Sequence, residues 1–128
     1  MFLLIDKPKG ITSHDVIDRI RKITGIRRTG HAGTLDPNAT GLLIVGVGRE
    51  STKELWTKFG KLDKTYVAEI TLGEERENDD NEGVKVNSLS LSSSSKPSIS
   101  TIKHVLISFI GEQMQVPPVY SAIKIKGK

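Results

Sequence analysis

Asp36 is the one carboxylate in a basic stretch of the chain. Between Arg19 and Arg49 there are six lysine or arginine residues and no other acidic residue. A carboxylate that faces a polyanion is repelled by it, so we expect one here only if it acts chemically or is turned inward as a cap. Nearby positive charge favours the ionised form of a carboxylate, and an ionised carboxylate in a rigid loop can act as a nucleophile or a base.

A purely structural interpretation of Asp36 is also open. Asp is a good helix N-cap, and Pro37 would suit the first helical position. An Asp before Pro is also held out of the α region, which suits a turn. The residue types alone therefore leave both capping and catalysis possible.

Four other side chains near this stretch or downstream of it could meet a nucleic acid. Arg27 and Arg28 are candidates to keep Asp36 ionised. His31 could donate to a phosphate or stack on a base, or it could be an ordinary exposed loop histidine. Tyr66 follows the basic Lys64, and unstacked bases commonly lie on aromatic faces. The alternative for Tyr66 is a core tyrosine with its hydroxyl at the edge of the core.

Several other kinds of site are not indicated. The chain has no cysteine, which excludes disulfides, thiolate catalysis and Cys-ligated zinc. Its three histidines are scattered, and the acidic segment 77–83 lacks the alternating ligand spacing of a calcium loop. The glycines of segment 41–51 are not followed by the lysine of a phosphate-binding loop, and no GxSxG stretch marks a serine hydrolase. We therefore expect no metal and no cofactor.

The charge distribution favours a polyanionic partner. The net charge is +4, but residues 74–82 hold six acids and one base. Outside this segment, the remaining 18 bases face 9 acids (19 less 1, and 15 less 6). Basic proteins bind nucleic acids by releasing counterions from phosphates. The apolar run at the start is only four residues long, too short for a signal peptide or a membrane span, so we expect a cytoplasmic protein without membrane contact.

Periodicity predicts an α+β fold, because helices and strands mix without strict βαβ alternation. Thr12 and Asp15 fit a capping box at the start of a helix, and Gly25 suits its end. The expected strands are 2–6, 42–48, 64–73 and an edge strand at 84–91, and the expected helices are 12–25, 52–60 and 98–112. Residues 26–41 are expected to form a loop, about 90–98 a flexible Ser-rich linker, and 115–128 an extended segment.

Four blocks of sequence resemble one family. They are DKPKGITS, GHAGTLDPNATGLLIVGVG, KTYVAEITLG and QVPPVYSAIKIKGK, in this order and at suitable spacing. Together they resemble the tRNA pseudouridine synthase B (TruB) family over essentially the whole chain, in the form of the bacterial, stand-alone enzymes. The resemblance implies an isomerase that converts the T-loop uridine of tRNA (position 55) to pseudouridine without metal or organic cofactor.

The resemblance also implies roles for three residues. The Asp of the TLDP motif, here Asp36, is the family's catalytic residue, and its role has been argued as nucleophile on the sugar or as base. His31 contacts the RNA where the target base is displaced, and Tyr66 stacks on the flipped base. Lys7, Lys9, Arg27 and Arg28 are candidate phosphate contacts. The uridine must leave its stack because its glycosidic bond is otherwise shielded.

Family members continue well beyond the last matching block. We therefore expect residues 1–128 to be the N-terminal portion of the catalytic domain, without the C-terminal half and a PUA-like RNA-binding domain. A half-sheet would leave unpaired edges and exposed apolar faces, so a second polypeptide is a candidate partner besides tRNA. Two other functions stay open: an RNA-binding module without turnover, and the catalytic subunit of a guide-RNA-dependent (H/ACA-type) particle.

Overall fold

The computed structural model describes residues 1–77, 80–81, 83–88 and 96–116. The chain forms two compact units, Met1–Tyr66 and Val67–Lys128. The candidate residues of the sequence analysis all fall in the first unit.

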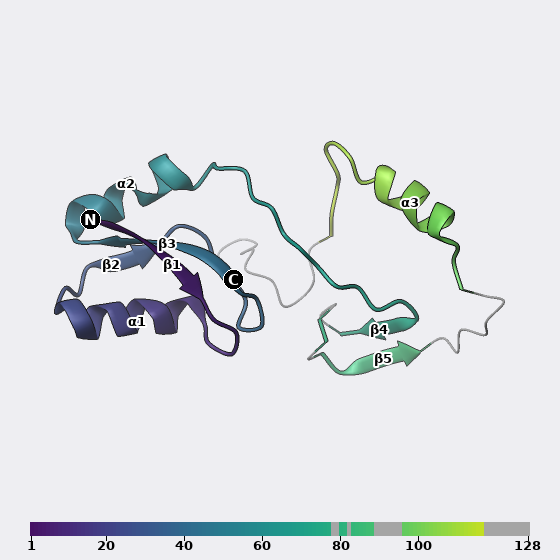
Figure 1. Ribbon diagram of the computed structural model, residues 1–128, viewed down its shortest axis with the longest axis horizontal. Helices are drawn as coiled ribbons and strands as arrows, with labels where there is room; N and C mark the ends of the chain where they lie inside the picture. The colour runs from purple at the N-terminus through teal and green to yellow at the C-terminus, as the bar shows by residue number, and fades with distance from the viewer. Residues whose placement is uncertain (78–79, 82, 89–95, 117–128) are drawn as a thin grey trace. The chain divides into compact units, whose positions relative to one another are not determined.

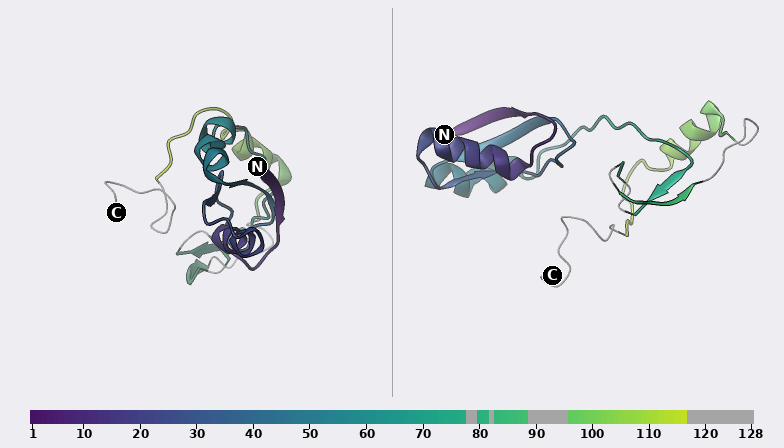
Figure 2. Two further views of the ribbon diagram at one scale, coloured as in Figure 1. Left: turned by 90° about the vertical axis from the view of Figure 1, so that its left-hand side faces the viewer. Right: turned by 90° about the horizontal axis from the view of Figure 1, so that it is seen from below.

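The first unit is built on a three-stranded antiparallel sheet with helices on its two faces (Figure 1). Strand β3 (Gly41–Val47) lies in the centre, between β1 (Phe2–Lys7) and β2 (Thr29–His31). The register pairs Lys7 with Gly41 and His31 with Val45. Helix α1 (Ser13–Thr24) follows β1, and α2 (Arg49–Phe59) follows β3. The view along the sheet in Figure 2 shows the two helices on opposite sides of the strands. The α+β class predicted from the sequence is confirmed.

The core lies between α1 and one face of β3. Side chains alternate along a strand, so every second residue of β3 points toward α1. The buried cluster is Val16, Ile17, Ile20, Leu43, Val45 and Val47, with Leu3, Ile5, Ile11 and Leu35 packed against it. On the other face, α2 approaches Gly46 so closely that a Cβ there would lie 3.0 Å from the Leu55 side chain. The small residue in β3 therefore allows α2 to pack on the sheet.

Helix α1 begins and ends as the sequence predicts. The Thr12 side chain accepts from the Asp15 amide at 3.0 Å, and the Thr12 amide donates to Asp15 Oδ2 at 2.7 Å. Gly25 follows the helix with φ of 70°, a conformation that glycine adopts without strain. The reciprocal cap fixes Ser13 as the first helical residue.

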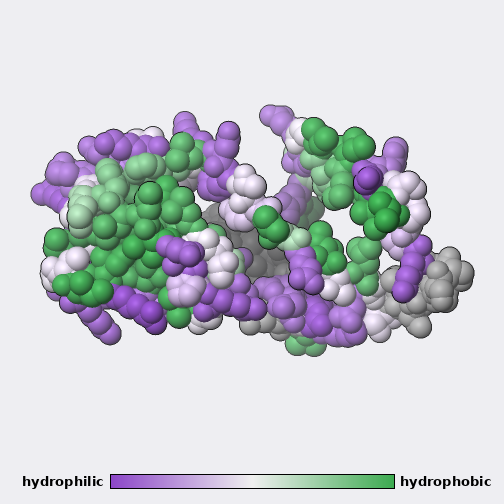
Figure 3. All heavy atoms as spheres, viewed as in Figure 1, coloured by the Kyte–Doolittle hydropathy of each residue, from purple (hydrophilic) through white to green (hydrophobic). Residues whose placement is uncertain are grey.

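Part of the sheet's second face is apolar and exposed. Figure 3 shows hydrophobic side chains gathered over the strands of this unit. The large apolar residues that β1 and β3 expose are Leu4 at 70% and Leu42 at 61%. Exposed apolar surface was expected for an incomplete sheet, and it is present on these two strands.

The described residues of the second unit form a short hairpin and one helix. Strand β4 (Glu74–Arg76) pairs antiparallel with β5 (Lys85–Ser88), and Glu74 accepts from Lys85 at 2.7 Å and from Arg76 at 3.0 Å. These two cations hold the pKa of the Glu74 carboxyl below its usual value. Helix α3 (Ile99–Ile107) starts at Ser98, whose side chain accepts from the Thr101 amide at 3.1 Å.

Three predictions about these elements need correction. Residues 64–71, predicted as most of a strand, form no helix or strand, because the alternating pattern has no partner strand among the described residues. The predicted loop 26–41 contains β2 at its start, since residues 29–31 pair with β3. Helix α3 is shorter than predicted, and its expected inner face is exposed: Ile99, Ile102, Val105, Leu106 and Phe109.

The remaining elements agree more closely or cannot be compared. Strand β5 falls within the predicted edge strand, and α2 starts three residues before its predicted start. The acidic segment 74–82 begins with β4. Most of the Ser-rich linker and of the segment 115–128 lies outside the described residues.

The capping box predicts an acid-sensitive contribution to stability. Hydrogen bonds from the Thr12 hydroxyl and amide lower the pKa of Asp15 from 3.8. A lowered folded pKa stabilises the fold above the unfolded value, and this stabilisation is lost as the pH falls through the folded value. We expect Thr12→Ala, which removes the hydroxyl, to cost about 1 kcal/mol at neutral pH. Urea unfolding at several pH values should show this cost shrinking below pH 3.8. A cost that does not change with pH would contradict the role of the Asp15 carboxylate.

Candidate active site

Asp36 lies at the start of a turn between β2 and β3. The amide of Ala39 donates to the Asp36 carbonyl at 3.0 Å, which closes a four-residue turn with Pro37 in its second position, where proline is favoured. The turn interpretation is confirmed. The helix-cap interpretation is wrong, because no helix begins at this position. Among the described residues, the exposed Asp36 carboxylate has no hydrogen-bond or ion-pair partner.

The peptide before Asp36 is held by the first residue of α1. The Ser13 hydroxyl donates to the Leu35 carbonyl at 3.0 Å and accepts from the Leu35 amide at 2.9 Å. Ser13 is only 3% exposed, and the Leu35 side chain packs against the core. One buried hydroxyl therefore satisfies both polar groups of the residue before Asp36.

The backbone after Asp36 is held at Pro37 from the turn between β1 and α1. The carbonyl of Pro37 accepts from the Gly10 amide at 2.8 Å and from Lys7 Nζ at 3.3 Å. Lys7 Nζ also donates to the carbonyls of Ile11 at 2.7 Å and Pro8 at 3.0 Å. The backbone on both sides of Asp36 is thus fixed by contacts from Lys7, Gly10 and Ser13, while the carboxylate itself has no partner among the described residues.

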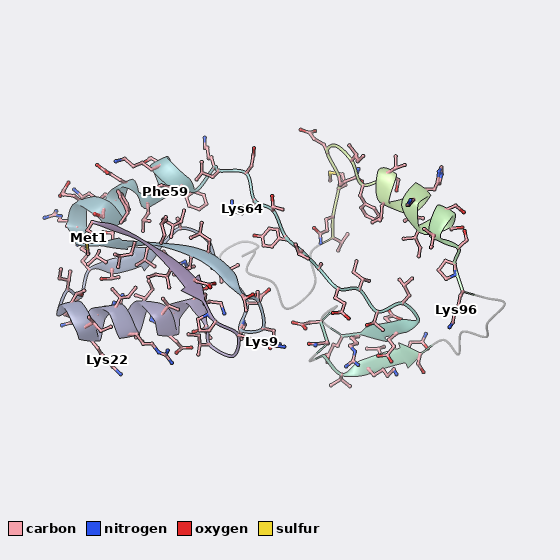
Figure 4. The ribbon with its side chains drawn as sticks, in the orientation of Figure 1. Met1, Lys9, Lys22, Phe59, Lys64 and Lys96 are labelled. Carbon is pink, nitrogen blue, oxygen red and sulfur yellow. The ribbon has the colours of Figure 1, made fainter. Side chains whose placement is uncertain are left out.

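Lys7 is a correction to the sequence prediction. It was proposed as a phosphate contact, but it is 0% exposed, and its three donors all meet backbone carbonyls. A buried ammonium that is fully used in this way cannot also reach RNA. Lys9, two residues on, is exposed at the turn between β1 and α1 (Figure 4).

His31 ends β2 and is turned toward its own loop. Its ring Nδ1 contacts the carbonyl of Gly33, and the amide of the next residue, Ala32, donates to Ile44 of β3 at 2.9 Å. Because a carbonyl oxygen only accepts, this contact places a proton on Nδ1 and leaves Nε2 for another partner. His31 is therefore held in the same loop as Asp36, with one ring nitrogen available.

Arg27 and Arg28 are exposed on the segment between α1 and β2. Arg21 of α1 holds this segment, since its guanidinium donates to the carbonyls of Arg27 and Thr29, at 3.1 Å each. In the part of the chain that the structure describes, neither Arg27 nor Arg28 forms an ion pair with Asp36.

Tyr66 lies outside any strand and is 67% exposed. The interpretation of Tyr66 as a core tyrosine is wrong. Its hydroxyl makes no hydrogen bond among the described residues, and no contact joins its ring to the Asp36 loop there. The structure thus places His31 at the end of β2 and Asp36 in the loop that follows, and among the described residues no hydrogen bond or ring contact brings Tyr66 to them.

Sequence reasoning missed Ser13. The only signal was its place directly after the capping residue and within the DKPKGITS block, and a serine at the start of a helix normally needs no further explanation. Within the described residues there is no group of three or more His, Asp or Glu side chains placed to hold a metal ion. No described helix has the length and apolar character that crossing a membrane requires.

Comparisons with known proteins now give the family. Residues 21–128 match the family model described as "TruB family pseudouridylate synthase (N terminal domain)". The matched range contains the loop between β2 and β3 with Asp36, and most of the chain. The chain belongs to the TruB family.

Curated relatives from the TruB family agree with this assignment. A tRNA pseudouridine synthase B of Desulfotalea psychrophila is 48% identical over 125 residues, which are 98% of this chain and 49% of that protein. Proteins of the same name from Alkaliphilus oremlandii and Tropheryma whipplei are each 44% identical, over 98% of this chain and 40% and 33% of theirs. The chain therefore spans about a third to a half of the length of these TruB relatives.

One similar solved structure is described as an H/ACA RNP bound to a substrate RNA containing 2'-deoxyuridine. It is 39% identical to this chain, with a TM-score of 0.41, over 44% of this chain and 17% of that one. The overlap is too small to add to the assignment, which depends on the TruB family model and the curated relatives.

The buried position of Lys7 predicts a structural role for this residue. Lys7→Met keeps most of the side-chain volume but removes the donor from the carbonyls of Pro8, Ile11 and Pro37. An unsatisfied buried polar group costs about 1–3 kcal/mol, and the Pro37 carbonyl keeps its bond from the Gly10 amide, so we expect a loss of about that size in urea unfolding, mainly from the Ile11 carbonyl. Lys9→Met, at an exposed position two residues away, is the matched control and should change stability little. Equal effects of the two variants would show that Lys7 does not hold the loop.

Proposed function

We propose that this chain carries the catalytic aspartate of an enzyme that converts the T-loop uridine of tRNA to pseudouridine. The observation that supports it most directly is the state of Asp36. Its backbone neighbours are fixed by Ser13, Lys7 and Gly10, whereas its carboxylate is exposed and has no partner among the described residues. Curated relatives named tRNA pseudouridine synthase B share 43–48% identity with nearly the whole chain, which supports the substrate and reaction.

The reaction is an isomerisation that needs no co-reactant. The bond between N1 of uracil and C1′ of the ribose breaks, the base turns, and C5 forms a new bond to C1′. C5 loses its proton and N1 gains one, so atoms and electrons balance within the nucleotide. A carboxylate can assist as a nucleophile at C1′ or as a base, and both roles require a carboxylate that no protein group already occupies.

The target uridine must be displaced from its stack before its glycosidic bond can be reached. We assign His31 to the RNA at the displaced base, because its Nε2 is free to bond while Nδ1 is held by the Gly33 carbonyl. We assign Tyr66 to stacking on the flipped base, because its ring is 67% exposed and offers a face. Tyr66 would have to approach the loop when RNA binds.

Phosphate contacts are assigned to Lys9, Arg27 and Arg28, which are exposed and form no ion pair among the described residues. Each would contribute through release of counterions from the RNA. Lys7 is left out because it is buried. A longer continuation or a second polypeptide would supply the part of the relatives that this chain does not match, including an RNA-binding domain. We place the reaction in the cytoplasm, where a tRNA substrate is available.

The first test is product formation on a T-arm stem-loop RNA. Chain 1–128 and its Asp36→Asn variant would be incubated with the RNA, and pseudouridine would be detected by mass labelling after digestion. Where the parent forms product, we expect at least a hundredfold less with the variant, because the amide cannot act as nucleophile or base. Asp63→Asn is the matched control, since Asp63 is also exposed.

The other outcomes separate the competing functions. Product formed equally by Asp36→Asn would remove Asp36 from the mechanism. Binding of the stem-loop without any product would indicate an RNA-binding module that needs a further polypeptide for turnover. Product that requires an added guide RNA would favour a particle subunit.

Salt dependence of RNA binding tests Lys9. If Lys9 contacts a phosphate, Lys9→Gln should weaken binding and make the slope of log affinity against log salt shallower by about 0.7–0.9. Lys53→Gln on α2, also at an exposed position, is the control and should leave the slope unchanged. The slope can be measured by filter binding or fluorescence anisotropy. Identical slopes for both variants and the parent would remove Lys9 from the interface.

A further inference from the structure

Ser13 and Leu35 form a ring of two hydrogen bonds, although 22 residues separate them in the sequence. The hydroxyl acts as donor to the Leu35 carbonyl and as acceptor from the Leu35 amide. Two antiparallel strands exchange the same pair of bonds at a hydrogen-bonded position, so the Ser13 side chain replaces a missing neighbouring strand at this point. Ser13 itself cannot shift, because the capping box fixes the start of α1 and the side chain is buried.

The two hydrogen bonds from Ser13 restrain Leu35, the residue that precedes Asp36. Leu35 is held by its two backbone bonds and by the contact of its side chain with the core. The peptide that joins Leu35 to Asp36 therefore has a fixed direction, and the bonds to the carbonyls of Asp36 and Pro37 hold the backbone on the other side, so the Cα–Cβ bond of Asp36 is fixed from both sides. No side chain among the described residues restrains the carboxylate itself, so its placement depends on this backbone, of which Ser13 holds the N-terminal part.

We propose that Ser13 is a positioning residue for catalysis, which aims the Asp36 carboxylate by holding both backbone groups of Leu35. The inference depends on the proposed function, in which Asp36 carries out the chemistry. Ser13 touches neither the substrate nor the reacting atoms, and its hydroxyl acts only through the loop. The consequence is a specific kinetic pattern: loss of the hydroxyl lowers kcat, while the RNA-binding residues, and so KM, change little.

The test compares Ser13→Ala with Ser51→Ala. Ser51 is also buried and also forms a hydrogen bond, but it lies in α2 and has no contact with the loop of Asp36. It therefore controls for the general cost of removing a buried serine hydroxyl. In the form of the enzyme that makes product, we expect Ser13→Ala to lower kcat about 10- to 100-fold, because small displacements of a catalytic group have effects of this size. Ser51→Ala should change kcat much less, and Ser13→Thr, which keeps a hydroxyl, should recover most of the loss.

A second measurement does not depend on activity. The Leu35 amide donates to Ser13 Oγ, whereas the Ala32 amide donates to Ile44. Hydrogen exchange of chain 1–128 should therefore accelerate at Leu35 in Ser13→Ala and remain unchanged at Ala32. Unchanged exchange at Leu35, or equal losses of kcat in Ser13→Ala and Ser51→Ala, would overturn the inference. Failure of the proposed function would appear separately, as product formation by Asp36→Asn.

Discussion

The loop around Asp36 depends on hydrogen bonds that buried groups of the β1–α1 connection make to its backbone. The Ser13 hydroxyl meets both polar groups of Leu35, and Lys7 and Gly10 both donate to the carbonyl of Pro37. A buried donor or acceptor without a partner costs about 1–3 kcal/mol, so these bonds strongly limit the alternative conformations of the loop. The loop between β2 and β3 is thus held at Leu35 and Pro37 by contacts from outside the loop, although it has no regular structure.

The elements that supply these bonds also form the core. The capping box sets the first residue of α1, and the apolar face of the same helix packs on alternate residues of β3. The position of Ser13 is therefore determined by both the cap and the core. Leu35 connects the loop to the core, because its backbone is hydrogen-bonded to Ser13 and its side chain packs against the core cluster. The unit is small, but its few buried residues are arranged so that the fold and the loop are stabilised together.

The features that the sequence predicted well are those set by residues close together in the chain. The capping box, the helical spacing of α1, the terminating Gly25 and the Asp–Pro turn depend on residues within a few positions of one another. Lys7 could not be interpreted in the same way, because lysine is almost always exposed and its acceptors come from Pro8, Ile11 and the distant Pro37. The strand predicted at residues 64–73 was wrong for a different reason. Alternation of apolar and polar residues favours a strand, but a strand also needs a neighbouring strand with which to pair. The roles of His31 and Tyr66 came from the family resemblance and stay predictions.

The hydrogen bonds of Lys7 explain how a carboxylate in a basic segment can remain outside an ion pair with it. A buried ammonium commonly pairs with an acid, and Asp36 directly precedes one of the residues that Lys7 contacts. An ion pair between them would have satisfied Lys7 but occupied the carboxylate. Lys7 instead donates to three carbonyl oxygens, whose dipoles compensate its charge without using an acid. The nearby cation thus orders the backbone of the loop, and the Asp36 carboxylate has no ion-pair partner among the described residues.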